Sequence, residues 1–159
     1  MSIRSTAKAI IVNDGKVLIN KCFDKYNGEY FSLPGGGQNT YETLYDAVIR
    51  ECLEETGYTV SPARFAALCE EICDSEEFRE KRPDYAHKMY HIFVCSLTDE
   101  ERTEPTEKDE LQIGSEWVDI DRLNGIRLLP KAVGDNILKI INSDSPLFLD
   151  STHIPYNHG

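Results

Sequence analysis

The sequence predicts an α/β fold of one domain, and three observations lead to this prediction. The chain has 159 residues, 40% of them hydrophobic, which suits a single domain with a buried core. Segments rich in β-branched and aromatic residues alternate with two segments of helical periodicity. A proline and three consecutive glycines separate the first strands from the first helix. We therefore expect one domain over residues 1–159, in which residues 143–159 form a C-terminal tail.

The first elements are predicted to be two antiparallel strands, over residues 7–12 and 16–22. Asn13-Asp14-Gly15 between them is a hairpin turn signal. A loop over residues 23–29 then leads to a short strand over residues 30–33. Aromatic residues near this strand are core or edge residues by default, and base stacking by one of them is the minority interpretation. They are Tyr26, Tyr30 and Phe31.

The first helix follows the glycines, which are expected to form a flexible turn. Asn39 or Thr40 is a suitable N-cap, and Glu42 stands at the capping-box spacing from Asn39. The helix should therefore begin close to Thr40 or Tyr41. Gly57 suits the left-handed position at its end. Helical periodicity predicts an apolar stripe that can be buried, consisting of Tyr45, Val48, Ile49, Cys52 and Leu53.

The rest of the chain is predicted to hold further strands and a second helix. In order, the segments are a strand over 64–73, a charged connection over 74–86, a strand over 87–97, a polar loop over 98–109, a strand over 116–120 and a helical turn over 121–125. An amphipathic helix over 131–142 is entered through Pro130. The tail has no clear periodicity, so a packed tail, an interface arm and disorder all remain open.

Three glutamates should share one face of the first helix, because residues three and four apart are neighbours. Glu51, Glu54 and Glu55 would repel each other, and the C-terminal end of a helix already disfavours anions. A divalent cation would offset this repulsion, and carboxylate ligands favour Mg²⁺ or Mn²⁺ over zinc or copper. The helix taken alone favours a simpler interpretation, a solvated acidic face. The spacing of the wider segment decides between the two.

That wider segment has a fixed pattern. Five residues separate Gly36 from Glu42, seven separate Glu42 from Arg50, and Glu-Cys-Leu-Glu-Glu-Thr-Gly-Tyr follows. This resembles the Nudix box, G-x5-E-x7-R-E-U-x-E-E-x-G-U with U a bulky apolar residue, at every charged and glycine position. Cys52 is a mildly unusual occupant of the first U position. The chain also has Asn39-Thr40-Tyr41 where many members have a Gly-Glu pair, which should alter the loop more than the metal site.

The Nudix resemblance implies an α/β/α sandwich with a mixed central sheet. It implies hydrolysis of a nucleoside diphosphate linked to another group X, with Mg²⁺ or Mn²⁺ held by Glu51, Glu54 and Glu55. Arg50 would pair with the box carboxylates and position Glu51, and Glu42 would cap the helix or support this set. The backbone at Gly35, Gly36 and Gly37 would approach the substrate closely. The partner would be a small nucleotide-type diphosphate, and a homodimer is compatible with the resemblance.

The general base and the specificity residues are expected outside the box. Glu110 and Glu107 are the candidates for the base, with Glu70 and Glu71 behind them. In a chain short of positive charge, the charged connection carries a basic cluster that could contact substrate phosphate, although a solvated loop is the simpler interpretation. Its candidate residues are Arg79 and Arg82, beside Lys81. The group X and the substrate are not identified by the sequence.

Charge and composition restrict the partners. The net charge is −11, from 28 acidic and 17 basic residues, which opposes binding to long nucleic acids but not to a small phosphorylated substrate. The first residues lack a signal peptide and no apolar run is long enough to cross a bilayer, so a soluble cytoplasmic protein without a membrane partner is expected. The five cysteines should be reduced and partly buried.

Three alternative functions compete with that of a Nudix hydrolase. Cys69-x3-Cys73-x13-His87-x3-His91 meets the loose spacing of a zinc finger. The histidine segment is rich in strand formers, however, and extended residues four apart lie roughly 13 Å from each other, too far to share one ion. A non-catalytic Nudix-fold nucleotide-binding or regulatory module is the main alternative, and an isoprenoid diphosphate isomerase is another. Both are disfavoured because the box carboxylates are intact.

Overall fold

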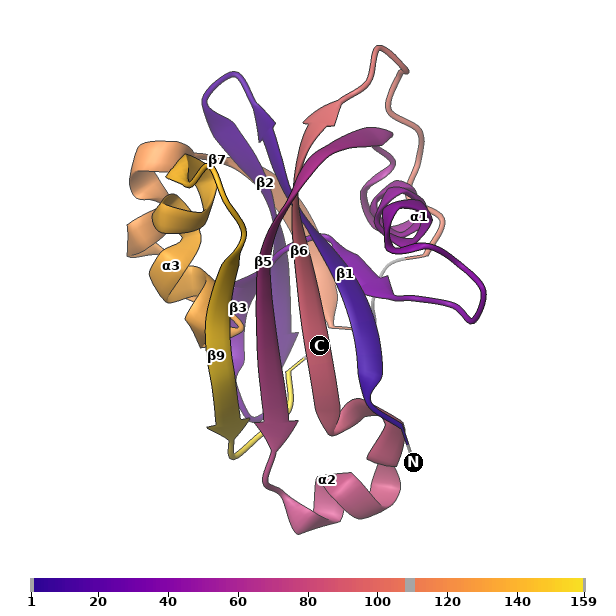
Figure 1. Ribbon diagram of the computed structural model, residues 1–159, viewed down its shortest axis with the longest axis vertical. Coiled ribbons are helices and arrows are strands. Elements are labelled where there is room, and N and C mark those ends of the chain that lie inside the picture. Colours follow the sequence, from indigo (N-terminus) through magenta and orange to yellow (C-terminus); the bar gives the residue numbers. More distant parts are fainter. Residues whose placement is uncertain (1, 108–110, 159) are drawn as a thin grey trace.

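The computed structural model describes residues 2–107 and 111–158 (Figure 1). The strands are β1 (Arg4–Asn13), β2 (Lys16–Asp24), β3 (Gly28–Ser32), β4 (Gly35–Gly37), β5 (Val60–Cys73), β6 (His87–Leu97), β7 (Gln112–Asp119), β8 (Leu128–Leu129) and β9 (Leu147–Ile154). The helices are α1 (Leu44–Thr56), α2 (Glu76–Lys81) and α3 (Lys131–Asn142), with two short 3-10 helices, η1 (Pro83–Tyr85) and η2 (Ile120–Gly125). None of the described helices is long and apolar enough to cross a membrane.

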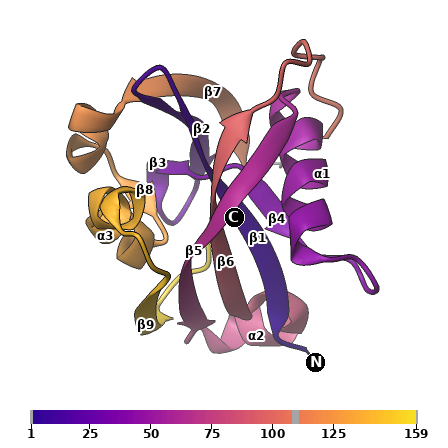
Figure 2. The same cartoon turned by 45° about the horizontal axis from the view of Figure 1, so that its top comes forward.

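The strands form one mixed, curled sheet (Figures 1 and 2). Its order is β8-β3-β2-β1-β6-β5-β9, with β4 paired to β1 and β7 paired to β2. The pairs β1–β6, β5–β9 and β3–β8 are parallel, and the other pairs are antiparallel. The predicted α/β class with a mixed sheet is confirmed.

Helices cover both faces of this sheet, because successive side chains of a strand point to opposite faces. In β1, Ile10 packs in a core with Ile137 of α3. Its neighbours Ala9 and Ile11 pack in a second core with Val48 of α1. Figure 1 shows α1 and α3 on opposite sides of the sheet. The α/β/α sandwich that the resemblance implies is therefore present.

Elements with a strong local signal lie where they are predicted. The β1–β2 hairpin turns at Asp14 and Gly15, whose φ angles are 49° and 71°. The strand predicted over 87–97 is β6, and the helix predicted over 131–142 is α3, which begins after Pro130. All five cysteines are buried free thiols, as expected.

The predicted start of α1 is wrong by a few residues. The helix begins at Leu44, and the N-cap is Thr43, whose side chain accepts a hydrogen bond from the Asp46 amide at 3.1 Å. The Asn39–Glu42 pair instead closes a turn, since the Glu42 amide donates to the Asn39 carbonyl at 3.1 Å. The predicted stripe is only partly buried: Tyr45 and Leu53 are exposed, while residues with smaller side chains, Ala47 and Thr56 among them, are buried instead.

Three segments have more regular structure than predicted. The glycine segment, expected as a flexible turn, is strand β4, paired with β1. The charged connection contains α2, whose N-cap Ser75 accepts a hydrogen bond from the Phe78 amide at 3.2 Å. The tail contains β9, which pairs in parallel with β5, so of the three open states it is a packed tail over the residues described. In β4 and β9 the pairing strand, and not the local sequence, determines the conformation.

Candidate active site

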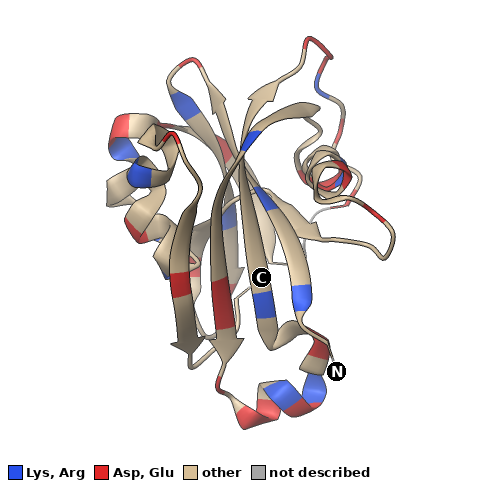
Figure 3. Ribbon diagram, viewed as in Figure 1, with Lys and Arg blue, Asp and Glu red and all other residues tan. Residues whose placement is uncertain are grey.

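An acidic cavity opens between β4, α1 and the loop that leads into β7. It has a volume of about 170 Å³ and is lined by Arg4, Gly35, Gly36, Gly37, Glu51, Glu55 and Glu107. Figure 3 shows acidic residues on α1 and on this loop, and basic residues at the lower ends of β1 and β6. The predicted glycines and two of the three predicted helix carboxylates thus line one cavity.

The glycines of β4 allow the strand to lie directly against α1 (Figure 2). A Cβ atom added to Gly36 would lie 2.6 Å from Oε2 of Glu51, inside van der Waals contact. Gly35 has a φ of +136°, and a Cβ atom there would meet the Ala7 carbonyl oxygen at 2.1 Å. A side chain at Gly35 would clash with the backbone of β1, whereas a side chain at Gly36 would displace the Glu51 carboxylate.

Arg50 connects the box carboxylates to β4. Its guanidinium donates to both oxygens of Glu42 at 2.7 and 2.9 Å, to Oε1 of Glu51 at 2.9 Å and to Oε2 of Glu54 at 3.1 Å. It also donates to the Gly37 carbonyl at 2.9 Å. These hydrogen bonds lower the pKa of Glu42 to about 2 and raise the pKa of Arg50 above its ordinary value. Arg50 is thus placed to orient the carboxylates and is not among the residues that line the cavity.

Glu55 is held from the opposite side by the sheet. Its side chain is buried, and Oε2 accepts hydrogen bonds from Asn20 Nδ2 at 3.2 Å and from the Gly35 amide at 3.3 Å. Asn20 lies on β2 and Gly35 on β4, so two strands fix the direction of this carboxylate.

The loop before β7 brings another carboxylate to the helix. The amides of Thr106 and Glu107 both donate to the Glu54 carbonyl at 2.9 Å, which satisfies a carbonyl at the helix end. The pKa of Glu54 is raised, first by desolvation and also by repulsion from Glu51 and Glu107, while Arg50 acts in the opposite direction. The carboxylates of this site therefore carry more negative charge than one guanidinium can neutralise.

The donors fit a hard divalent cation in their chemistry. Carboxylate oxygens are ligands that Mg²⁺ and Mn²⁺ prefer, and Glu51, Glu55 and Glu107 line the same cavity. Arg50 binds one oxygen each of Glu51 and Glu54, so this pairing uses only half of either carboxylate. Within residues 2–107 and 111–158, no three His, Cys, Asp or Glu side chains already converge as a finished ligand set. The fit consequently rests on the donor types and on their shared cavity.

Arg4 is a residue of the cavity that the sequence did not indicate. Its guanidinium lies against β4, because a Cβ atom on Gly37 would be 2.5 Å from one of its nitrogens. The same guanidinium lies 4.3 Å from the centre of the Tyr85 ring, and Arg82 contacts that ring at the same distance. Arg4 is far from the box in sequence and carries no motif, so only the pairing of β1 with β4 reveals it.

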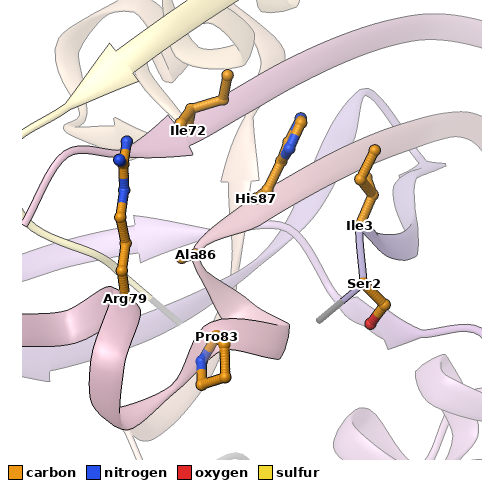
Figure 4. Close-up of a pocket in the computed structure, with 7 residues that line it drawn as sticks. All are labelled: Ser2, Ile3, Ile72, Arg79, Pro83, Ala86 and His87. Atoms are coloured by element: carbon orange, nitrogen blue, oxygen red, sulfur yellow. The ribbon is translucent and has the colours of Figure 1, made fainter. Parts of the chain in front are cut away.

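The two arginines predicted to bind substrate lie elsewhere. Arg79 donates to the Cys73 carbonyl at 2.6 Å and to Asp74 at 3.0 Å. It lines a separate cavity of about 450 Å³ beside α2, together with Ser2, Ile3, Ile72, Pro83, Ala86 and His87 (Figure 4). Arg82 stacks on Tyr85. Neither arginine lines the acidic cavity, although Arg82 and Arg4 share the Tyr85 ring.

The base candidates are separated by the structure. Glu107 lines the acidic cavity, whereas Glu110 lies outside the described residues. Glu70 hydrogen-bonds to His87 at 2.6 Å and to Ser151 at 2.7 Å, in a different part of the sheet. Glu71 is buried beside the C-terminal tail. Glu107 is thus the one candidate among the described residues that reaches the box carboxylates.

The zinc-finger pattern is not assembled in the described structure. His87 and His91 lie on strand β6, in the extended conformation that was predicted. His87 pairs with Glu70, and Nδ1 of His91 lies 3.0 Å from the Thr6 carbonyl oxygen. The two cysteines, Cys69 and Cys73, are buried in β5.

The chain is similar to known proteins in sequence and in fold. The NUDIX domain family matches residues 3–139. Uncharacterized Nudix hydrolase YvcI from Bacillus subtilis is 28% identical over 134 residues, which cover 84% of this chain and 75% of that protein. A Caenorhabditis elegans protein whose name includes nudix hydrolase 1 is 28% identical over 148 residues, and this chain spans only 36% of its length. The crystal structure of the mMutator MutT protein from Bacillus halodurans has a TM-score of 0.67 at 22% identity, covering 96% of this chain and 91% of that one.

Proposed function

The chain belongs to the Nudix family, and we propose that it hydrolyses a nucleoside diphosphate linked to another group X, with Mg²⁺ or Mn²⁺ as cofactor. One observation carries this proposal: two box carboxylates, Glu51 and Glu55, meet the glycine strand and Arg4 in one cavity. A site that is negative on one side and has a guanidinium on the other suits a diphosphate that arrives with a cation. The proposal concerns a small nucleotide-type substrate.

Glu51, Glu54 and Glu55 would hold the metal ion. When bound, such an ion neutralises the diphosphate and orients phosphorus for attack by water. Arg50 keeps Glu51 and Glu54 in place through its hydrogen bonds at 2.9 and 3.1 Å, and Asn20 does the same for Glu55. These residues act before any chemistry, by fixing the direction of charged groups that would otherwise repel each other.

The substrate would be bound by β4 and Arg4. Glycine lets the β4 backbone approach the diphosphate without a side chain between them. The Arg4 guanidinium can donate to a phosphate oxygen on the other side of the cavity. Stacking on Tyr85 leaves the guanidinium in a fixed position, which lowers the entropy lost on binding.

The reaction breaks one phosphoric anhydride bond. The oxygen of water forms a bond to phosphorus, the P–O bond to the leaving phosphate breaks, and the bonding electrons go to the leaving oxygen. A carboxylate accepts the proton that water loses. Glu107 is our candidate because it lines the cavity, and Glu110 remains the other candidate. The products are a nucleoside monophosphate and the phosphate of X.

A substrate screen tests the proposal. Nucleotide sugars, ADP-ribose, dinucleoside polyphosphates and nucleoside triphosphates would each be incubated with the protein and either Mg²⁺ or Mn²⁺, and the phosphorylated products measured. We expect hydrolysis of at least one class, dependent on the metal. If no class is hydrolysed while nucleotides still bind, the chain is a non-catalytic nucleotide-binding module, which is the main alternative.

A further inference from the structure

The end of the C-terminal tail fills a buried polar pocket on the sheet. His158 is 5% exposed, and its Nε2 lies 2.9 Å from Oε1 of Glu71. Its backbone carbonyl accepts a hydrogen bond from Nζ of Lys88 at 2.9 Å. Tyr90 lies parallel to the imidazole, with centroids 6.5 Å apart and an angle of 13°, and Tyr30 meets it edge-on at 6.2 Å. The pocket therefore holds a flat heterocycle next to two aromatic rings.

The chemistry of these contacts defines what the pocket recognises. Glu71 as a carboxylate can only accept, so the imidazole Nε2 that faces it carries a proton. Lys88 can only donate, and it does so to a carbonyl oxygen. The pocket thus binds a ring N–H donor next to a carbonyl acceptor, which in His158 belongs to the backbone. Nucleobases present this combination along their edges and stack on aromatic side chains.

The tail reaches the pocket through contacts of its own. Beyond β9, the Tyr156 ring stacks on Tyr26 at 5.2 Å, and Asn27 donates to the Asn157 carbonyl at 3.1 Å. His158 thus lies at the end of a segment that a few contacts hold to the sheet. A competing aromatic ring can take the place of its imidazole.

The pocket lies within reach of the acidic cavity. The register pairs Gly37 of β4 with Thr6 of β1, and Thr6 with Tyr90 of β6. Two strand spacings separate Gly37 from Tyr90, roughly 10 Å along the sheet. Lys88 is paired in register with Arg4, which lines the acidic cavity. A nucleotide that places its phosphates beside Gly37 can therefore place its base near Tyr90.

We propose that the pocket formed by Tyr30, Glu71, Lys88 and Tyr90 binds the base of the nucleotide, and that His158 is an internal occupant that competes with it. This inference rests on the proposed function for the position of the phosphates. It identifies a site for the base and assigns a role to the tail. The base can bind only when His158 has left the pocket. The tail therefore lowers the apparent nucleotide affinity in proportion to the fraction of molecules in which the pocket is free.

Binding of nucleoside monophosphates to the full chain tests this inference. AMP and UMP would be titrated by calorimetry into the parent protein, into His158→Ala and into a chain that ends at Tyr156. We expect both variants to bind at least one of these nucleotides roughly tenfold more tightly than the parent, as for a tail that occupies the pocket nine-tenths of the time. Ribose 5-phosphate, which has no base, should bind equally to all three. His153→Ala is the matched control, because His153 lies in the same tail but is exposed.

Each other outcome overturns the inference. Unchanged or weaker nucleotide affinity in both variants means that the ring of His158 is structural or belongs to the binding site itself. Equal gains for ribose 5-phosphate mean that the tail blocks the phosphates and not the base. Thermal melting of each variant shows that it is folded. Because binding is measured without turnover, a chain that gains affinity but hydrolyses nothing refutes the proposed function and leaves the base pocket standing.

Discussion

The acidic cavity differs in charge balance from the pocket that holds His158, which we call the tail pocket and which is formed by Tyr30, Glu71, Lys88 and Tyr90. Beside the cavity, the Arg50 guanidinium contacts the carboxylates of Glu42, Glu51 and Glu54 at 2.7 to 3.1 Å, and Glu55 and Glu107 line the cavity together with Glu51. The side chains of Arg50 and Glu54 are 28% and 25% exposed, so water still reaches them. An excess of negative charge is tolerated there because the site is exposed to water. This uncompensated charge can attract a cation.

The tail pocket is closed and nearly neutral. Lys88 and Glu71 are 2% and 4% exposed, and each compensates for the other. Burial lowers the pKa of Lys88 to about 8, even though Glu71 acts to raise it. An additional charge in this pocket would be expensive to bury, so the pocket favours a ligand without a further charge. The two sites therefore differ in exposure to water and in net charge. The open acidic cavity suits the proposed metal and phosphates, and the closed tail pocket suits the proposed ring.

The same substitution, glutamate to glutamine, should affect the two clusters differently. Glu54→Gln beside the cavity removes the charge of a proposed metal ligand and keeps the volume, so we expect turnover to fall by about a thousandfold, as when a charged group that acts on the transition state is lost. The free energy of unfolding should change by less than about 1 kcal/mol, because the lost ion pair is partly exposed and repulsion is relieved. Steady-state kinetics with saturating Mg²⁺ and urea denaturation measure the two effects.

Glu104→Gln is the matched control for Glu54→Gln. Glu104 is exposed in the same loop that carries Glu107, so its substitution changes the net charge equally without touching the cavity. Turnover of this variant should equal that of the parent. If Glu54→Gln were as fast as the parent, the assignment of the metal site would be refuted.

Glu71→Gln in the tail pocket should have the reverse effect. It leaves Lys88 buried without a carboxylate. We therefore expect the free energy of unfolding to fall by about 3 kcal/mol, as for buried pairs that lose one partner. Urea denaturation at pH 7 checks this value. If the free energy of unfolding fell by less than about 1 kcal/mol, the contribution of the Lys88–Glu71 pair would be no larger than that of an exposed salt bridge. The two clusters would then not differ in this respect.

Glu42→Gln tests how much the ion pair between Glu42 and Arg50 contributes to stability, and how this contribution depends on pH. The pKa of Glu42 is lowered to about 2 from its ordinary value of 4.5, so its stabilising contribution is complete above pH 4.5 and is lost as the pH falls toward 2. The variant should be less stable than the parent by about 2 kcal/mol at pH 7, since a carboxylate with two hydrogen bonds from Arg50 is lost. The difference should shrink steadily between pH 4.5 and pH 2. A difference independent of pH would show that the Glu42 charge contributes nothing.

The parts of the fold that were predictable depend on local signals. Strand β6 and helix α3 have clear periodicity, and the hairpin has its Asn-Asp-Gly turn, so the sequence sufficed for them. Strand β4 consists of three glycines, which have no preference for strands, and it exists because β1 pairs with it. Strand β9 likewise depends on the distant edge of β5. The start of α1 was missed because several adjacent residues can cap a helix and only packing selects Thr43.

The candidate site divides in the same way. Helical spacing places Glu51, Glu54 and Glu55 on neighbouring positions of one helix, which the sequence predicts directly. Glu107 joins them because its loop docks on the Glu54 carbonyl, and Arg4 joins because β1 lies beside β4. Both contacts are long-range and leave no mark in the sequence. The basic residues predicted from composition lie instead at α2.

Arg4→Ala examines the residue that connects the two clusters. Arg4 lines the acidic cavity, and its charge also helps to lower the pKa of Lys88, its register partner. Loss of one phosphate contact should raise KM about tenfold, or about 1.4 kcal/mol, with a smaller change in kcat. Arg79→Ala is the competing test, since Arg79 lines the cavity beside α2. If Arg79→Ala raised KM and Arg4→Ala did not, the substrate phosphates would bind beside α2, and the link between cavity and tail pocket would be lost.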